Sequence, residues 1–219
     1  TVLNVWNAKT GKYDLTVEQL LVASLGQNPT MTPGDEGTFE YSNMNFMLLG
    51  LIAEAASCEL GSCKTIRELI TDLVTSEGLD NTIYPIGTEW GTDAHTNGTW
   101  DYFGVNSDFT ETTPSVPNAA GAMISNIDDQ LDWLVEVTTN RHGTLSPETF
   151  AKRFQRTSDM NGMVGLERAG YGLAMYGQHS LDTGALMLGH GGELSGYQTL
   201  MFRYPGDAST DLDDLFVVA

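Results

Sequence analysis

In several stretches of the first 160 positions, apolar residues recur every three or four residues, which is the spacing of an amphipathic helix. Residues that start or stop helices flank these stretches: Thr16 opens the first, Ser42 or Asn43 the second, and Gly78 closes the third. Pro147 stands at the first position of the last. The pattern predicts helices at 15–21, 45–53, 65–76 and 126–138, and one that starts at 146. In the helix at 126–138 the side chains expected to face inward are Ile127, Leu131, Leu134 and Val135.

From Tyr171 onward the period changes to that of strands, with short polar turns between apolar runs. Strands are predicted at 171–176, 185–188, 197–204 and 215–218. Consecutive antiparallel pairing is the simplest topology for them. Helices followed by a meander give an α+β fold. Residues 84–118, rich in Gly, Thr, Asn and Asp, are expected to form a long excursion with a short strand or two, at the rim of a cleft.

The length of 219 residues suits one large domain or two small ones. We expect a single domain over 1–219, with a helical region at about 15–160 and a sheet region at about 165–219. The chain stops inside its last predicted strand, which would leave an open sheet edge. More protein is therefore expected beyond it.

Charge narrows the range of partners. Asp and Glu number 29 against 10 Lys and Arg, a net charge of -19. Such a surface repels nucleic acid and anionic membranes, so no nucleic-acid partner is predicted. The longest apolar run, 46–53, is too short to span a bilayer. The oligomeric state is left open.

Two cysteines, Cys58 and Cys63, bracket a turn-like stretch and could close a small disulfide loop; two free thiols are the alternative. The tripeptide at 97–99 is a glycosylation sequon. Both features favour an extracellular or secretory compartment. No zinc is predicted, because the histidines lack paired ligand spacing. They are His95, His142, His179 and His190. The acidic turn at 207–214 lacks the pattern of a calcium loop, so no metal and no cofactor are expected.

Tyr41 and Asn43 flank the start of the second predicted helix. An unperturbed tyrosine titrates at about 10 and becomes a plausible proton shuttle only beside an ammonium group. An asparagine amide can donate to a substrate carbonyl and accept from a lysine at once. The alternative is a tyrosine packed under a loop, followed by a helix cap.

The segment His190-Gly191-Gly192 lies late in the chain. Its glycines would let a substrate backbone approach closely, and the amide of Glu193 could help to stabilise an oxyanion. His190 could orient a substrate carbonyl or carboxylate. The alternative is a glycine-rich hairpin turn with a surface histidine. We predict that Tyr41 and His190 face each other across one groove.

Together these stretches resemble the serine β-lactamase, DD-peptidase and esterase family. Residues 79–82, 120–125 and 171–173 resemble further family segments, in the same order. The resemblance implies a β-lactamase/transpeptidase-like fold, in which an antiparallel sheet accompanies a mostly helical region. It also implies that a Ser-x-x-Lys serine is acylated while lysine and tyrosine share the proton work.

By position, the resemblance makes Tyr41 the acid/base tyrosine and Asn43 the amide that orients substrate. His190 and Gly192 become third-motif residues, Gly191 and Gly192 line the substrate, and Glu193 offers its backbone N–H. No cofactor is implied, and the partner would be a small-molecule or peptide substrate.

One departure limits the resemblance: no serine in the chain is followed three places on by lysine. Ser62-Cys63-Lys64 has the wrong spacing. The nucleophile is therefore expected outside these residues, upstream of Tyr41. His190 also stands where lactamases have lysine, which favours ester or peptide substrates over penicillin.

Three hypotheses follow. The leading one is a serine hydrolase that acts by acyl transfer on an ester, an amide or a D-amino-acid peptide. The second is a binding or structural member of the same fold without catalysis. The third is an unrelated α+β domain with chance motifs.

Overall fold

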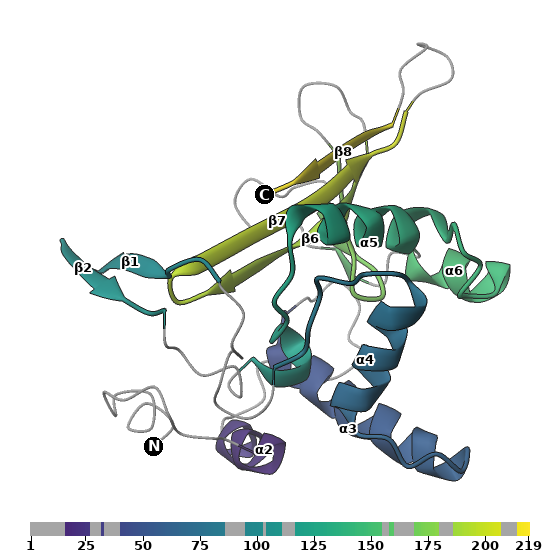
Figure 1. Cartoon of the computed structure of the whole chain (residues 1–219), viewed down its shortest axis with the longest axis horizontal. Coiled ribbons are helices and arrows are strands. Elements are labelled where there is room, and N and C mark those ends of the chain that lie inside the picture. The colour runs from purple at the N-terminus through teal and green to yellow at the C-terminus, as the bar shows by residue number, and fades with distance from the viewer. Residues whose placement is uncertain are drawn as a thin grey trace. The chain divides into compact units, whose positions relative to one another are not determined.

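The computed structural model describes residues 16–26, 32, 40–85, 95–102, 104–110, 117–154, 158–159, 169–179, 186–206 and 214–219 (Figure 1). The chain divides into two compact units. The first unit contains Thr1–Pro29, Tyr41–Asn126 and Glu193–Gln198. The second contains Thr30–Glu40, Ile127–Gly192 and Thr199–Ala219. Each unit is described by itself.

The first unit is built on helices α2 (Val17–Leu25), α3 (Asn43–Glu59) and α4 (Ile66–Ser76), with the short 3-10 helix η1 (Asn118–Ala120). The predicted cap Thr16 is confirmed and forms a capping box, and of Ser42 and Asn43 it is Ser42 that caps α3. Thr65, predicted only as the first residue of its helix, forms a second capping box before α4. Gly78 follows α4 with φ at +72°. The helix α3 extends beyond the predicted 45–53. It contacts α2, α4 and η1.

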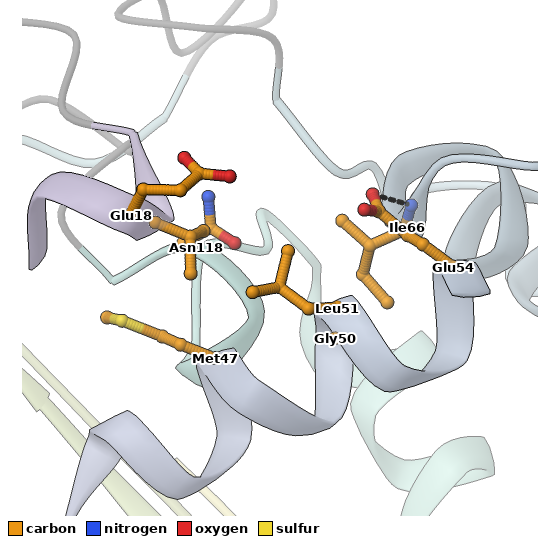
Figure 2. A pocket seen from close by; sticks show the side chains of 8 residues that line it. Glu18, Met47, Gly50, Leu51, Glu54, Ile66 and Asn118 are labelled. Atoms are coloured by element: carbon orange, nitrogen blue, oxygen red, sulfur yellow. Dashed lines mark hydrogen bonds between the residues drawn. The ribbon is translucent and has the colours of Figure 1, made fainter. Parts of the chain in front are cut away.

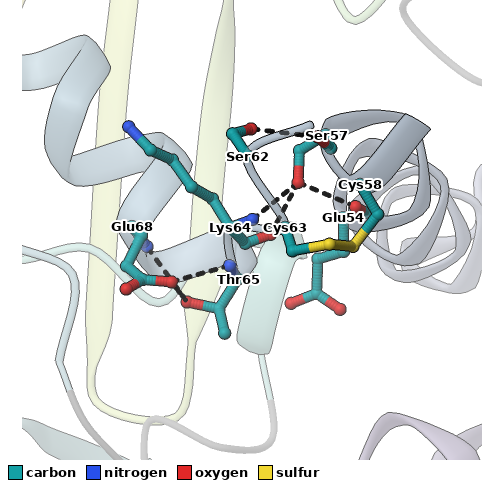
Figure 3. Close-up of a disulfide and its surroundings, with 8 residues drawn as sticks. All are labelled: Glu54, Ser57, Cys58, Ser62, Cys63, Lys64, Thr65 and Glu68. Carbon is teal, nitrogen blue, oxygen red and sulfur yellow. Dashed lines mark hydrogen bonds between the residues drawn. A yellow bond between two sulfur atoms is a disulfide. The ribbon is translucent and has the colours of Figure 1, made fainter. Parts of the chain in front are cut away.

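A disulfide joins Cys58 and Cys63 at the corner between α3 and α4 (Figure 3). Beneath it, the buried Ser57 hydroxyl accepts from the Lys64 amide at 2.7 Å and lies 3.0 Å from the Lys64 carbonyl oxygen. The Ser62 hydroxyl donates to the Ser57 carbonyl at 3.0 Å. The corner is therefore held by a hydrogen-bonded serine as well as by the sulfur bond.

The long polar excursion contains two short strands, as predicted. Strands β1 (Thr99–Tyr102) and β2 (Val105–Asp108) form an antiparallel hairpin. In the same unit, the Tyr197 hydroxyl donates to the Thr96 carbonyl at 3.0 Å. The Tyr197 ring occupies the space that a side chain at Gly98 would need. Only glycine permits this close approach.

The second unit contains the sheet. Its strands are β3 (Ser158–Asp159), β4 (Ala169–Tyr171), β5 (Tyr176–His179), β6 (Leu186–Leu194), β7 (Tyr197–Tyr204) and β8 (Leu215–Val218). They lie in sequence order, and the registered pairs β3–β4, β4–β5, β5–β6 and β7–β8 are antiparallel. The predicted α+β class and consecutive pairing are confirmed. Residues 193–198, which are the end of β6, the turn and the start of β7, count with the first unit.

Two strand predictions need correction. Residues 171–176 are not one strand: the Gly172 amide donates to the Met175 carbonyl at 2.9 Å, which closes a turn between β4 and β5. Ala174 there has a φ of +60°, a conformation that an alternating pattern does not reveal. The strand predicted at 185–188 continues to Leu194. The His-Gly-Gly segment is therefore strand rather than hairpin turn, and the turn falls at Ser195 and Gly196.

Helices α5 (Ile127–Thr139) and α6 (Pro147–Arg153) also belong to the second unit, and α5 packs against β8. The predicted inward face of α5 is partly wrong: Leu134 is 1% exposed, whereas Ile127 is 61% and Leu131 is 38% exposed. The helix instead buries polar side chains that form hydrogen bonds. A pattern of apolar residues does not predict such burial. Glu136 accepts from the His142 amide at 2.9 Å.

Arg203 ties α5 to two strands. From β7 its guanidinium donates to the Thr138 carbonyl on α5 at 2.9 Å. Its Nε donates to Asp214, just before β8, at 3.0 Å. The amide of Gly206 and then Arg203 hold the pKa of the Asp214 carboxyl below its usual range.

Among the described residues, no helix is both long and apolar enough to cross a membrane.

Candidate functional site

Tyr41 and Asn43 stand at the start of α3 in the first unit. Ser42 adopts an extended conformation and its hydroxyl accepts from the Met44 amide at 3.3 Å, so α3 begins at Asn43. The Tyr41 side chain precedes the helix and is 37% exposed, with its ring 6.0 Å from that of Phe46. Asn43 is exposed. The N-cap geometry therefore leaves both the phenol and the carboxamide at the surface.

His190, Gly191 and Gly192 lie within β6, between β5 and β7. The half-buried His190 ring has a partner at each nitrogen. Its Nδ1 lies within hydrogen-bonding distance of the Gly191 carbonyl oxygen, and its Nε2 lies 3.2 Å from the Tyr171 hydroxyl. The imidazole is thus bonded to its own strand and to β4.

Two tyrosines enclose this imidazole. Tyr171 and Tyr176 face each other in the β4–β5 register, and Tyr176 pairs with Gly189 on β6. Their ring centroids lie 5.9 Å and 4.6 Å from that of His190. Burial lowers the pKa of His190 and raises the pKa of Tyr176. Such an environment favours a neutral imidazole.

The three glycines around His190 differ in what surrounds them. A β-carbon at Gly189 would overlap the Met201 carbonyl of β7, so packing requires glycine there. A β-carbon at Gly191 would lie 3.5 Å from the nearest atom, an ordinary contact. At Gly192 it would meet the Thr199 hydroxyl at 2.6 Å, and that side chain can rotate. The fold therefore requires glycine at 189 but tolerates a side chain at 191.

Glu193 follows in β6 and is exposed. It belongs to the first unit with Tyr41 and Asn43, whereas His190, Gly191 and Gly192 belong to the second. The groove expected between Tyr41 and His190 stays a prediction, as does the oxyanion role of the Glu193 amide.

A separate cavity of about 180 Å³ lies within the first unit (Figure 2). It is lined by Val17, Glu18, Met47, Gly50, Leu51, Glu54, Ile66 and Asn118. Glu54 accepts from the Ile66 amide at 2.7 Å. Burial, with a smaller contribution from the Glu54 charge, raises the pKa of nearby Tyr84 to about 12. Neither Tyr41 nor Asn43 is among the described residues that line this cavity.

Sequence reasoning missed Tyr171 and Tyr176 as partners of His190. Tyr171 entered only as part of a strand motif, and its contact with His190 depends on pairing across β4, β5 and β6. The available signal was the pair of tyrosines upstream of the strand that contains His190. It was not recognised because residues 171–176 were predicted as one strand, whereas a turn at 172–175 brings the two tyrosines opposite each other.

The chain matches the Beta-lactamase family over residues 2–219. It therefore belongs to that family, and its fold is β-lactamase/transpeptidase-like. No curated protein matches the sequence.

Solved structures of the same fold include an amidohydrolase and an amidase. A D-stereospecific amidohydrolase from a Streptomyces species is 20% identical with a TM-score of 0.76, over 92% of this chain and 58% of its own. A D-amino acid amidase from Ochrobactrum anthropi SV3, complexed with L-phenylalanine amide, is 18% identical with a TM-score of 0.71, over 94% and 56%.

A third similar structure is an octameric penicillin-binding protein homologue from Pyrococcus abyssi. It is 18% identical with a TM-score of 0.72, over 93% of this chain and 43% of its own. The chain thus spans between 43% and 58% of the length of these three solved chains. At these identities the likeness establishes the fold.

Proposed function

We propose that the protein is a serine hydrolase that acts by acyl transfer on an ester, an amide or a D-amino-acid peptide. The nucleophilic serine would lie on a segment other than these 219 residues. The observation that carries the proposal is the family match together with the exposed Tyr41 and Asn43 at the start of α3. The amidase and amidohydrolase relatives support an acyl-transfer reaction.

The proposed reaction has two steps. In the first, the serine oxygen attacks the substrate carbonyl carbon, and its proton passes through the Tyr41 phenol to the departing amine or alcohol as the C–N or C–O bond breaks. In the second, water attacks the acyl-enzyme, releasing the acid and returning the proton to the serine. Asn43 would orient the substrate, and the Glu193 amide would stabilise the oxyanion.

The space around Gly191 supports a substrate-lining role for the His190-Gly191-Gly192 segment. Because the fold tolerates a β-carbon there, packing alone does not account for this glycine. A substrate backbone that approaches the strand closely would account for it.

We also propose an extracellular or secretory setting. The disulfide between Cys58 and Cys63 supports it, because such bonds persist in oxidising compartments. The net charge of -19 would suit a salty exterior.

The alternative is a member of the fold that binds ligand or partner without catalysis. The absence of a Ser-x-x-Lys motif from these 219 residues favours it, unless another segment supplies the serine.

Labelling with an acylating probe separates the two. The natural polypeptide that carries this chain and the 219-residue chain alone would be treated with a fluorophosphonate or penicillin probe. Intact mass would be measured after each treatment. We expect one adduct on the natural polypeptide, at a serine outside the 219 residues, and none on the chain alone.

The Y41F variant of the natural polypeptide should label roughly 10²–10⁴-fold more slowly, which is the usual contribution of a positioned acid or base. Y84F is the matched control: it removes a phenol beside the separate cavity and should label at the normal rate. No adduct on the natural polypeptide, where a D-amino acid amidase reacts, would establish the non-catalytic alternative.

A further inference from the structure

The imidazole of His190 is held by two different kinds of partner. On one side is the carbonyl oxygen of Gly191, which can only accept a hydrogen bond. On the other is the hydroxyl of Tyr171, which can donate or accept. The pair of partners therefore restricts which nitrogen carries the proton.

Because the Gly191 oxygen cannot donate, Nδ1 must carry a hydrogen. In a neutral imidazole, Nε2 then presents a lone pair, and the Tyr171 hydroxyl donates to it. A doubly protonated ring would reverse the Tyr171 bond, but burial lowers the pKa of His190 and disfavours that form. The geometry thus corresponds to the neutral Nδ1–H tautomer.

Tyr171 is well placed to hold the imidazole in this arrangement. Its side chain is buried, with a residue exposure of 9%, and its ring packs edge-on against Tyr176 with centroids 4.8 Å apart. The Tyr176 ring in turn lies against the imidazole, with the two ring planes tilted by 44°. The hydroxyl is therefore held by a packed ring rather than by a mobile side chain.

We propose that the Gly191 carbonyl fixes His190 as the neutral Nδ1–H tautomer, and that Tyr171 is a positioning residue whose hydroxyl donates to Nε2 and so holds the imidazole against the Gly191–Gly192 peptide. The Nδ1–H bond holds the Gly191 carbonyl, which sets the direction of the following peptide unit. The segment then offers an uncharged imidazole beside the two glycines.

The tautomer itself does not depend on catalysis, whereas its effect on substrate rests on the proposed function. If that function holds, the segment lacks a positive charge for a substrate carboxylate at neutral pH. The group recognised there would be an uncharged ester or amide.

The test is nuclear magnetic resonance of the protein labelled with ¹⁵N-histidine. The chain has four histidines, and the signal that disappears in the H190Q variant is assigned to His190. Wild type should show His190 with protonated Nδ1 and unprotonated Nε2. In Y171F the ring stays and the hydroxyl goes, while the Gly191 carbonyl still accepts from Nδ1. His190 should therefore keep the Nδ1–H form, the Nε2 signal should shift as its hydrogen bond is lost, and the pKa of His190 should rise, since the neutral form loses a hydrogen bond.

The Y176F variant is the matched control, because it removes a hydroxyl from the same cluster and keeps the Tyr171 bond. Its His190 should remain the Nδ1–H tautomer. The Gly192 amide signal should shift in Y171F and stay in place in Y176F.

An Nε2–H tautomer in wild type would overturn the proposal, as would a Y171F spectrum identical to wild type. Should Y171F fail to fold, the wild-type tautomer alone decides. Probe labelling tests the proposed function separately. A negative labelling result therefore leaves the tautomer proposal intact, and a wrong tautomer leaves the proposed function intact.

Discussion

At the scale of single residues, neighbouring glycines of one strand serve different ends. Gly189 is fixed by β7, whose Met201 carbonyl leaves no room for a side chain. Gly191, two positions on, has ordinary space around it. The same residue type therefore reflects packing at one position and, on the proposed function, access for a substrate at the other.

Exchanging each glycine for alanine separates these roles. We expect G189A to lower the free energy of unfolding by about 1–3 kcal/mol or more, because β6 and β7 must move apart. G191A should stay within about 0.5 kcal/mol of wild type, since its β-carbon makes only ordinary contacts. Urea unfolding measures both. Equal losses in the two variants would contradict the assignment.

The sequence made some site residues visible and concealed others. Tyr41, Asn43 and His190 stood out because each belongs to a short motif. The Tyr171 hydrogen bond to His190 joins residues 19 apart, through a strand register that no local pattern encodes. Ser57 was missed for a related reason: its hydroxyl accepts a hydrogen bond from the Lys64 amide, seven residues away, at the bend between α3 and α4.

At the scale of elements, α4 shows how a local signal fixes a helix start. The Thr65 hydroxyl accepts from the Glu68 amide at 3.3 Å, and the Glu68 carboxylate accepts from the Thr65 amide at 2.8 Å (Figure 3). The Thr65 amide and then its hydroxyl lower the pKa of Glu68. A lowered pKa means that the stabilisation is present at neutral pH and is lost as the pH falls through the folded-state pKa.

Removing this cap should be measurable. T65A is expected to destabilise the protein by about 1 kcal/mol at neutral pH, because the Glu68 amide loses its acceptor. T75A on the same helix is the control: its exposed hydroxyl donates only to the Thr71 carbonyl, one turn back, and the change should cost less than about 0.5 kcal/mol. Thermal unfolding followed by circular dichroism gives both values. A cost for T75A as large as that for T65A would argue against the capping box.

Elements with their own start, stop and period were predicted well. Helix α2 begins next to its predicted cap Thr16, α4 has its predicted bounds to within one residue, and β7 and β8 have the predicted bounds. The turn at 172–175 was missed because Tyr171 to Tyr176 alternates as a strand does. Ile127 on α5 was predicted to be buried but is exposed. Periodicity identifies the apolar face of a helix, and on α5 polar residues occupy several of the buried positions.

At the scale of the whole molecule, the dominant property is charge. A net charge of -19 on 219 residues places many carboxylates near one another. Their mutual repulsion opposes the folded state, and salt screens it over a Debye length of about 10 Å at 0.1 M. The fold should therefore respond to ionic strength as a whole rather than through any one ion pair.

Raising sodium chloride from about 0.05 to about 0.5 M should raise the Tm. The same step at about pH 5, closer to the sequence pI of 4.2, should raise it less because fewer charges remain to be screened. Differential scanning calorimetry at both pH values measures the effect. A Tm that falls with salt at neutral pH would show that local ion pairs outweigh the collective repulsion.

The corner beneath the Cys58–Cys63 bond has a practical consequence. Because the Ser57 hydroxyl bonds the Lys64 backbone through atoms other than the sulfurs, we expect these contacts to hold the bend when reductant opens the bridge. On that expectation, the protein should keep its fold in buffers that contain thiols, and a cysteine-free version of the chain should serve as a starting point for attaching fluorescent labels elsewhere.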